Sequence, residues 1–134
     1  MIEFLLAQAL KRHEKLNAAK GIRDIGLIES AINAPFQTFG GQDLYPTIFD
    51  KATQLFYGLT KNHGFVDGNK RLALHATEIF LQVNNFMLNC SQDELVEVSL
   101  KIAASQISVD ELKFWLLRHS AGKIFFSGNI TITL

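Results

Sequence analysis

Residues 63–71, His-Gly-Phe-Val-Asp-Gly-Asn-Lys-Arg, bring together residue types that could handle a phosphate group. Gly68 permits a tight turn where a helix begins, and the free N–H groups of the first helical turn then favour an anion. The final lysine and arginine add two positive charges. Asp67 could hold Mg²⁺ together with phosphate oxygens and waters. Histidine titrates near neutral pH, so His63 could accept a proton from an attacking hydroxyl. These are the parts that phosphoryl or nucleotidyl transfer requires.

Each of these residues also has an ordinary structural interpretation. A histidine beside a loop is usually structural, and an aspartate before a helix is usually an N-cap. Lys70 and Arg71 in a first helical turn would usually be solvated. The helix dipole disfavours cations at that end, however, so a bound anion would offset their placement. The charge pattern therefore favours the functional interpretation.

As a set, the string H-x-F-x-D-G-N-K-R resembles the signature of the Fic/Doc superfamily, most closely its Doc branch, the death-on-curing toxins. The stretches GIRDIGLIESAI (21–32) and YPTIFDKA (45–52) are similar to the same family. The resemblance covers about residues 2–118. It implies an all-α Fic/Doc-type bundle of about six helices, with a short hairpin-like flap and a tail that could form a small β structure. We expect a Fic/Doc domain over residues 1–120 and a C-terminal tail over 121–134.

The resemblance also implies site roles, residue by residue. His63 corresponds to the general base, and Asp67 to the acid that holds Mg²⁺. Phe65 corresponds to the aromatic that anchors the loop in the core. The positions that correspond to ATP-phosphate binding are Gly68, Asn69, Lys70 and Arg71. ATP and Mg²⁺ are therefore the expected cofactors.

Lys70 separates two transfer chemistries within the superfamily. Members that transfer AMP carry a glycine at this position and a further arginine three residues after the first, where this chain has Leu74. Both departures are those of the Doc branch, which is understood to transfer the γ-phosphate of ATP to a threonine of elongation factor Tu and so to arrest translation. An AMP transferase of the Fic type and a catalytically idle binding module stay open as alternatives.

The resemblance further implies a protein target and a restraining partner. The segment 36–45 stands where the family has its target-binding flap, although an ordinary connection is the alternative. The expected flap residues are Gln37, Thr38, Phe39, Gly40, Gly41 and Gln42. No Ser/Thr-x-x-x-Glu-Gly/Asn inhibitory sequence occurs in the chain. Restraint should therefore come from a Phd-like antitoxin that folds on binding to a groove, visible as an exposed apolar patch.

Hydrophobic periodicity and capping signals predict the elements that position this site. We expect helices over about 2–18, from an N-cap at Asp24 to Pro35, from Pro46 in a first turn to Lys61–Asn62, and over about 68–84. Capping boxes that begin at Ser91 and Ser108 predict helices to about 104 and 118. Residues 35–46 should form a loop or short hairpin, and residues 123–134 a hairpin or extended segment. The other histidines should have no catalytic part, with an approach of His75 to the site as the alternative; they are His13, His75 and His119.

Composition restricts the protein class. Hydrophobic residues make up 48% and charged residues 19% of the 134 residues, which is typical of one globular domain. The net charge of zero argues against direct nucleic-acid binding. The mean hydropathy of +0.13 comes without an apolar run of about 20 residues, so we expect no membrane association. Cys90 is the single cysteine, so the expected protein is cytoplasmic and has no internal disulfide.

Overall fold

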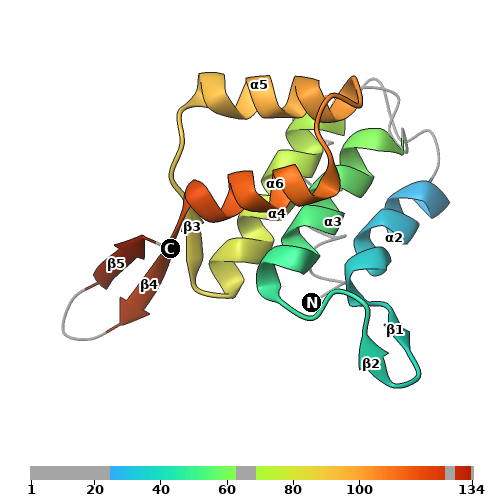
Figure 1. Cartoon of the computed structure of the whole chain (residues 1–134), viewed down its shortest axis with the longest axis horizontal. Helices are drawn as coiled ribbons and strands as arrows, with labels where there is room; N and C mark the ends of the chain where they lie inside the picture. Colours follow the sequence, from blue (N-terminus) through green and yellow to red (C-terminus); the bar gives the residue numbers. More distant parts are fainter. Residues whose placement is uncertain (1–24, 63–68, 126–128, 134) are drawn as a thin grey trace.

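The computed structural model describes residues 25–62, 69–125 and 129–133, and they form a mainly helical bundle (Figure 1). The helices in this part of the chain are α2 (Ile25–Asn33), α3 (Ile48–Lys61), α4 (Asn69–Val83), α5 (Gln92–Ala103) and α6 (Val109–Arg118). They confirm the predicted helices beyond residue 24 to within a few residues. The predicted helix over 2–18 and the cap at Asp24 lie outside the described residues. The bundle confirms the predicted all-α class, with five helices in the described residues where about six were expected for the chain.

Helices α3 and α4 form the centre of the bundle, and α2, α5 and α6 pack around them (Figure 1). Phe56 and Leu55 on α3 and Leu81 on α4 are fully buried. Leu112 and Leu116 on α6 are also fully buried, at the spacing of one helical turn. Burial of this kind contributes roughly 1.5–3 kcal/mol for each large side chain, so the apolar stripes fix the positions of α3 and α4.

Helix α3 begins at Ile48, two residues after Pro46, which the sequence analysis placed in its first turn. Thr47 is its N-cap: the Thr47 hydroxyl accepts from the Asp50 N–H at 3.0 Å, and the Asp50 carboxylate accepts from the Thr47 N–H at 3.2 Å. Pro46 therefore precedes the cap, and its predicted place in the first helical turn is wrong. The two predicted capping boxes are confirmed, because the hydroxyls of Ser91 and Ser108 accept from backbone N–H groups three residues later.

The segment between α2 and α3 contains the hairpin that the sequence allowed. A 3-10 turn (Ala34–Phe36) follows α2, and strands β1 (Thr38–Phe39) and β2 (Gln42–Asp43) pair antiparallel. Gly40 and Gly41 join the strands with φ angles of 60° and 81°. Two adjacent positive φ values are those of a type I′ turn, which strongly prefers glycine.

The C-terminal tail forms the predicted hairpin but is joined to a strand that the sequence did not predict. Strand β4 (Ser120–Phe125) pairs antiparallel with β5 (Asn129–Thr133) and also with β3 (Phe86–Leu88). The Phe86 ring meets the Phe49 ring of α3 edge-on at 4.9 Å, so β3 packs against the helical body. The division at residues 120 and 121 stays a prediction. No helix within residues 25–62 and 69–125 is long and apolar enough to cross a bilayer.

Candidate functional site

The junction of α3 and α4 contains the three motif residues that the structure describes. Helix α3 ends at Lys61 with Asn62 as its C-cap, and α4 begins at Asn69. Asn69, Lys70 and Arg71 thus form the first turn of α4, where the sequence predicted a helix start. His63, Phe65, Asp67 and Gly68 lie outside the described residues, so their predicted roles stay predictions.

The first turn of α4 differs in charge from those of three other helices. The first turns of α3, α5 and α6 carry acidic residues, and each of these helices starts with a capping box. The first turn of α4 has no acidic residue and contains Lys70 and Arg71. Cations at a helix N-terminus each cost roughly 0.3–1 kcal/mol unless an anion is present. The charge pattern of this turn suits a bound phosphate.

The end of α3 is fixed to two other parts of the bundle just before the motif. The Asn62 side-chain amide donates to the Leu27 carbonyl of α2 at 2.5 Å. The Lys61 ammonium donates to the Ser105 hydroxyl in the α5–α6 connection. It also lies 5.4 Å from the centroid of the Tyr57 ring. These contacts were not predicted, since Lys61 and Ser105 are 44 residues apart.

The hairpin of predicted flap residues adjoins the other end of α3. The Lys51 ammonium in the first turn of α3 bonds the Asp43 carboxylate at 3.1 Å and the Tyr45 carbonyl. Because α3 has 14 residues, its two ends are about 20 Å apart. The side chain of Phe39 is 81% exposed on this hairpin. The structure therefore brings Asn69, Lys70 and Arg71 together but places the hairpin about one helix length away (Figure 1).

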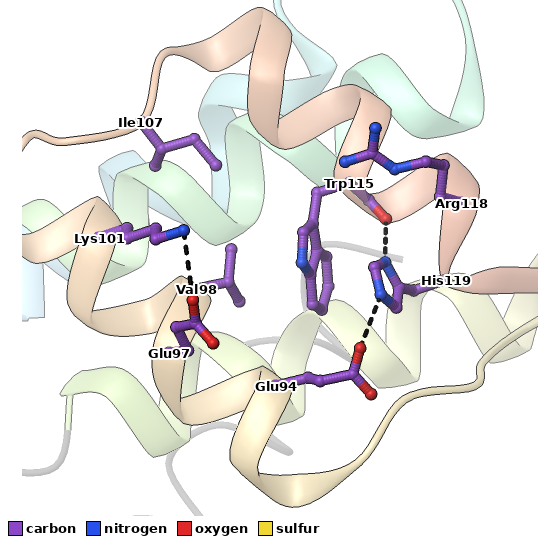
Figure 2. A pocket seen from close by; sticks show the side chains of 8 residues that line it. All are labelled: Glu94, Glu97, Val98, Lys101, Ile107, Trp115, Arg118 and His119. Carbon is purple, nitrogen blue, oxygen red and sulfur yellow. Dashed lines mark hydrogen bonds and ion pairs between the residues drawn. The ribbon is translucent and has the colours of Figure 1, made fainter.

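A polar pocket of about 240 Å³ lies between α5 and α6, and sequence reasoning did not find it (Figure 2). The Trp115 and His119 rings stack at 4.1 Å on one of its walls. Trp115 and His119 are four residues apart on one helix face, which is the signal that the sequence offered. The residues that line the pocket are Glu94, Glu97, Val98, Lys101, Ile107, Trp115, Arg118 and His119.

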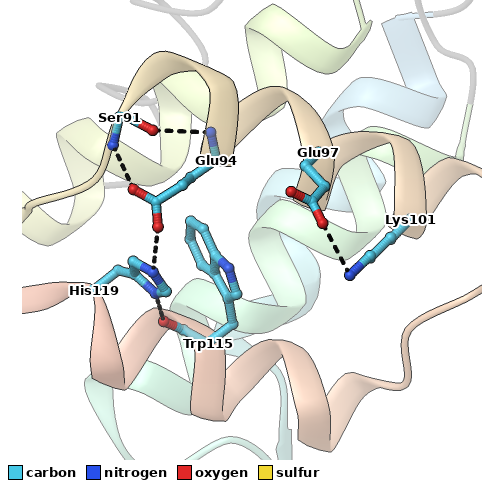
Figure 3. A network of polar contacts seen from close by, with 6 residues as sticks. All are labelled: Ser91, Glu94, Glu97, Lys101, Trp115 and His119. Carbon is cyan, nitrogen blue, oxygen red and sulfur yellow. Dashed lines mark hydrogen bonds and ion pairs between the residues drawn. The ribbon is translucent and has the colours of Figure 1, made fainter.

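Most polar groups of this pocket are already bonded to one another (Figure 3). The His119 ring nitrogens lie 2.8 Å from the Trp115 carbonyl and 3.0 Å from the Glu94 carboxylate. Glu94 also accepts from the Ser91 N–H, and this backbone hydrogen bond is the main reason that the pKa of Glu94 is lowered. Lys101 pairs with a glutamate one turn earlier. The contact between His119 and Glu94 joins the end of α6 to α5, which gives His119 a structural role.

Among the residues that the structure describes, no three His, Cys, Asp or Glu side chains lie close enough to hold a metal together. Mg²⁺ that arrives with a nucleotide needs only one or two carboxylates, because phosphates and waters complete its octahedron. Asp67, a hard oxygen donor next to the start of α4, fits that requirement by residue type. His75 lies on α4 one turn beyond Arg71 and is half-buried.

Comparison with known proteins gives the family. The chain is 43% identical over 72 residues to a protein named Toxin Doc from Mycolicibacterium smegmatis; the match covers 54% of this chain and 55% of that protein. The chain thus spans about half the length of this curated relative. The model of the Fic/DOC family matches residues 2–81, which are more than half of the chain. The matched part contains the hairpin and the α3–α4 junction. The chain belongs to the Fic/DOC family.

Proposed function

We propose that this chain is the toxin of a toxin–antitoxin pair and acts as a Mg²⁺- and ATP-dependent protein kinase of the Doc type. Its target would be a hydroxyl on a translation factor, elongation factor Tu by resemblance, and its effect the arrest of translation in the cytoplasm. The observation that carries the proposal is the motif 63–71 at the α3–α4 junction, with a cationic first turn in α4. The similarity to a protein named Toxin Doc supports the toxin assignment.

Each motif residue has one role in the proposed reaction. His63 takes the proton from the target hydroxyl as its oxygen attacks the γ-phosphorus of ATP. The bond between that phosphorus and the β,γ-bridging oxygen breaks, and ADP leaves with the electron pair. The backbone N–H groups at the start of α4, with Lys70 and Arg71, stabilise the charge on the phosphates. Asp67 holds Mg²⁺, which neutralises charge on the phosphates when bound.

Lys70 is the residue on which the choice between kinase and AMP transferase depends. A glycine there leaves room for ATP to present its α-phosphate to the hydroxyl. The long lysine side chain should obstruct that pose and stabilise the reverse one, in which the γ-phosphate is within reach. Lys70→Gly should therefore weaken γ-phosphate transfer, and Lys70→Arg should retain part of it.

Isotope transfer tests the proposal directly. Purified protein, Mg²⁺ and elongation factor Tu are incubated with ATP labelled at either the α- or the γ-phosphate, with His63→Ala as the control. We expect label on the factor from the γ-position alone and a loss of roughly 10²–10⁴ in rate for His63→Ala. Label from the α-position would make the chain an AMP transferase. No label from either position, on this factor or in cell extract, would favour the idle binding module.

The proposed toxin requires a Phd-like antitoxin that folds on binding. An amphipathic segment of such a partner could fold against exposed apolar side chains of this chain. Val96 and Leu100 lie one turn apart on α5 and are 48% and 49% exposed, so they form one apolar pair that such a segment could cover. The hairpin over 37–42 would hold an extended target segment, because its sheet in the described residues has only the strands β1 and β2, and an extended segment can pair with its edge.

A further inference from the structure

The last two residues before His63 hold the end of α3 by side-chain contacts that no motif role explains. Asn62 donates its side-chain amide to the Leu27 carbonyl, and its own N–H bonds the Gly58 carbonyl at 3.0 Å. Lys61 donates to the Ser105 hydroxyl. One helix end is thereby joined to α2 and to the α5–α6 connection at adjacent residues.

Ser105 has a left-handed backbone conformation, in which glycine is usual, so its serine side chain calls for an explanation. Its φ is 56°, in the left-handed region where a residue with a β-carbon is strained by about 1–2 kcal/mol and glycine is usual. It follows the Ala104 C-cap of α5, and its N–H bonds the Ile102 carbonyl at 3.0 Å. Glycine would satisfy the same turn without strain. What serine adds is the hydroxyl that accepts from Lys61.

We propose that Lys61 and Asn62, with Ser105 and the Leu27 carbonyl as their acceptors, form a clamp that positions His63. The inference rests on the proposed function, since it assigns these side chains to the alignment of the general base. Helix α3 approaches the motif as a rigid rod, and fraying of its last turn would displace the residue that follows Asn62. An error of about 1 Å in the position of a catalytic group can cost up to about 10²-fold in rate. The four are positioning groups and touch no substrate.

The clamp explains a cation at the C-terminal end of α3 as well. Lys61 lies in the last turn, where the helix dipole favours a positive charge. The Tyr57 ring one turn earlier adds a cation–π contact, so the ammonium is held between α3 and the α5–α6 connection.

Ser105→Gly is the sharpest variant, because it removes the hydroxyl and at the same time relieves backbone strain. The matched control is Asn85→Gly, which relieves a similar left-handed conformation, φ 69°, at the other end of α4. Both variants should fold, with a midpoint temperature equal to or above that of the parent protein. Ser105→Asn is the conservative variant, because asparagine tolerates this region and its side-chain oxygen can accept from Lys61.

The first readout needs no activity. Amide hydrogen exchange of the Asn62 N–H should accelerate about three- to tenfold in Ser105→Gly, the effect expected when one solvent-exposed hydrogen bond is lost. Asn62→Ala should act in the same direction on the neighbouring amides of the last turn. Asn33→Ala is its control, because it removes a similar amide-to-carbonyl bond, 2.7 Å to Glu29, elsewhere in the bundle.

The second readout is transfer of γ-labelled phosphate to elongation factor Tu. In Ser105→Gly and Asn62→Ala we expect kcat to fall about three- to tenfold with the KM for ATP unchanged, and Ser105→Asn to restore kcat. Exchange at Asn62 equal to that in Asn85→Gly would overturn the clamp. Faster exchange with unchanged kcat would overturn its positioning role. If His63→Ala retains full activity, or the parent protein transfers nothing, the proposed function fails instead, and exchange alone decides on the clamp.

Discussion

Replacement of Asp50 by alanine should destabilise the protein more than any other single change in its helix caps. Its carboxylate completes the capping box of α3 with Thr47 and also bonds the Lys113 ammonium of α6 at 2.7 Å. The variant keeps the Thr47 cap but loses the hydrogen bond from the Thr47 N–H and the negative charge at the helix N-terminus, which together cost about 1 kcal/mol. The ion pair is partly shielded, with exposed fractions of 34% and 21% for the two side chains, and contributes about 0.5–1 kcal/mol. The sum is about 2 kcal/mol in the free energy of unfolding, or roughly 6–10 °C in midpoint temperature for a chain of this length.

Three further variants separate the two contributions. Asp50→Asn keeps an oxygen that can accept from the Thr47 N–H and loses only the ion pair, so its cost should be about half. Lys113→Met should cost a similar amount, and the double variant should cost no more than either alone. Asp110→Ala is the matched control, since Asp110 also stands in a first helical turn. Urea unfolding measures all of these. Equal losses for Asp50→Ala and Asp110→Ala, or fully additive losses for Asp50→Asn and Lys113→Met, would refute the reasoning.

The Asp50 carboxylate makes the free energy of unfolding depend on pH, and its stabilising contribution decreases as the pH falls. Its hydrogen bond with Lys113 is the largest cause that lowers the pKa of Asp50 below the ordinary value of 3.8. A group with a lowered folded pKa stabilises the native state above its unfolded pKa, and this contribution is lost as the pH falls through the folded value. The loss in free energy of unfolding caused by Asp50→Ala should therefore be complete at pH 7 and become smaller below about pH 4.

Three other predictions follow from single residues. The backbone N–H groups of their capping serines lower the pKa of Glu94 and Glu111, so Glu94→Gln with Glu111→Gln should reduce acid destabilisation between about pH 5 and 3, measured by circular dichroism. Burial raises the pKa of the Cys90 thiol to about 11, so iodoacetamide should label it far more slowly at pH 8 than free cysteine, and rapid labelling would contradict the described burial. Asp67→Asn should raise the Mg²⁺ concentration needed for ATP-dependent transfer and leave the midpoint temperature within about 2 °C. Asparagine caps a helix about as well as aspartate, so Asp67→Ala is the variant whose lower midpoint temperature would instead make Asp67 a helix cap.

The sequence predicted those features whose physical cause is local. The helices that start at Ser91 and Ser108 were predicted because serine, glutamate and the free N–H groups all lie within four residues. The capping box of α3 was missed because it has aspartate instead of glutamate at its third position, and Pro46 was assigned to the helix in its place. The twin glycines at 40 and 41 allowed the hairpin for a similarly local reason.

Features that depend on distant pairing could not be predicted. Strand β3 is three residues long, and its partners, such as Ala121 opposite Met87, come more than thirty residues later. The stacked pair of Trp115 and His119 gains its glutamate partner from another helix, and the Lys61–Ser105 contact joins residues 44 positions apart. In the candidate site the motif was recognisable from its consecutive residues, whereas the contacts that hold the end of α3 required the fold.

Helix α3 ties together the two regions that the family resemblance assigns to catalysis and to target binding. Lys51 in the first turn of α3 bonds the hairpin segment, and Lys61 and Asn62 hold the last turn. The two regions are therefore separated by the length of α3, which is about 20 Å. An extended chain advances about 3.3 Å per residue, so about six target residues separate a group on the hairpin from one at the start of α4. A target held at both places must therefore present its hydroxyl on an extended segment of at least that length. Under the proposed function, selection of the target would then depend on residues well away from the phosphorylated one, which would allow a general phosphate-transfer site to act on a single protein.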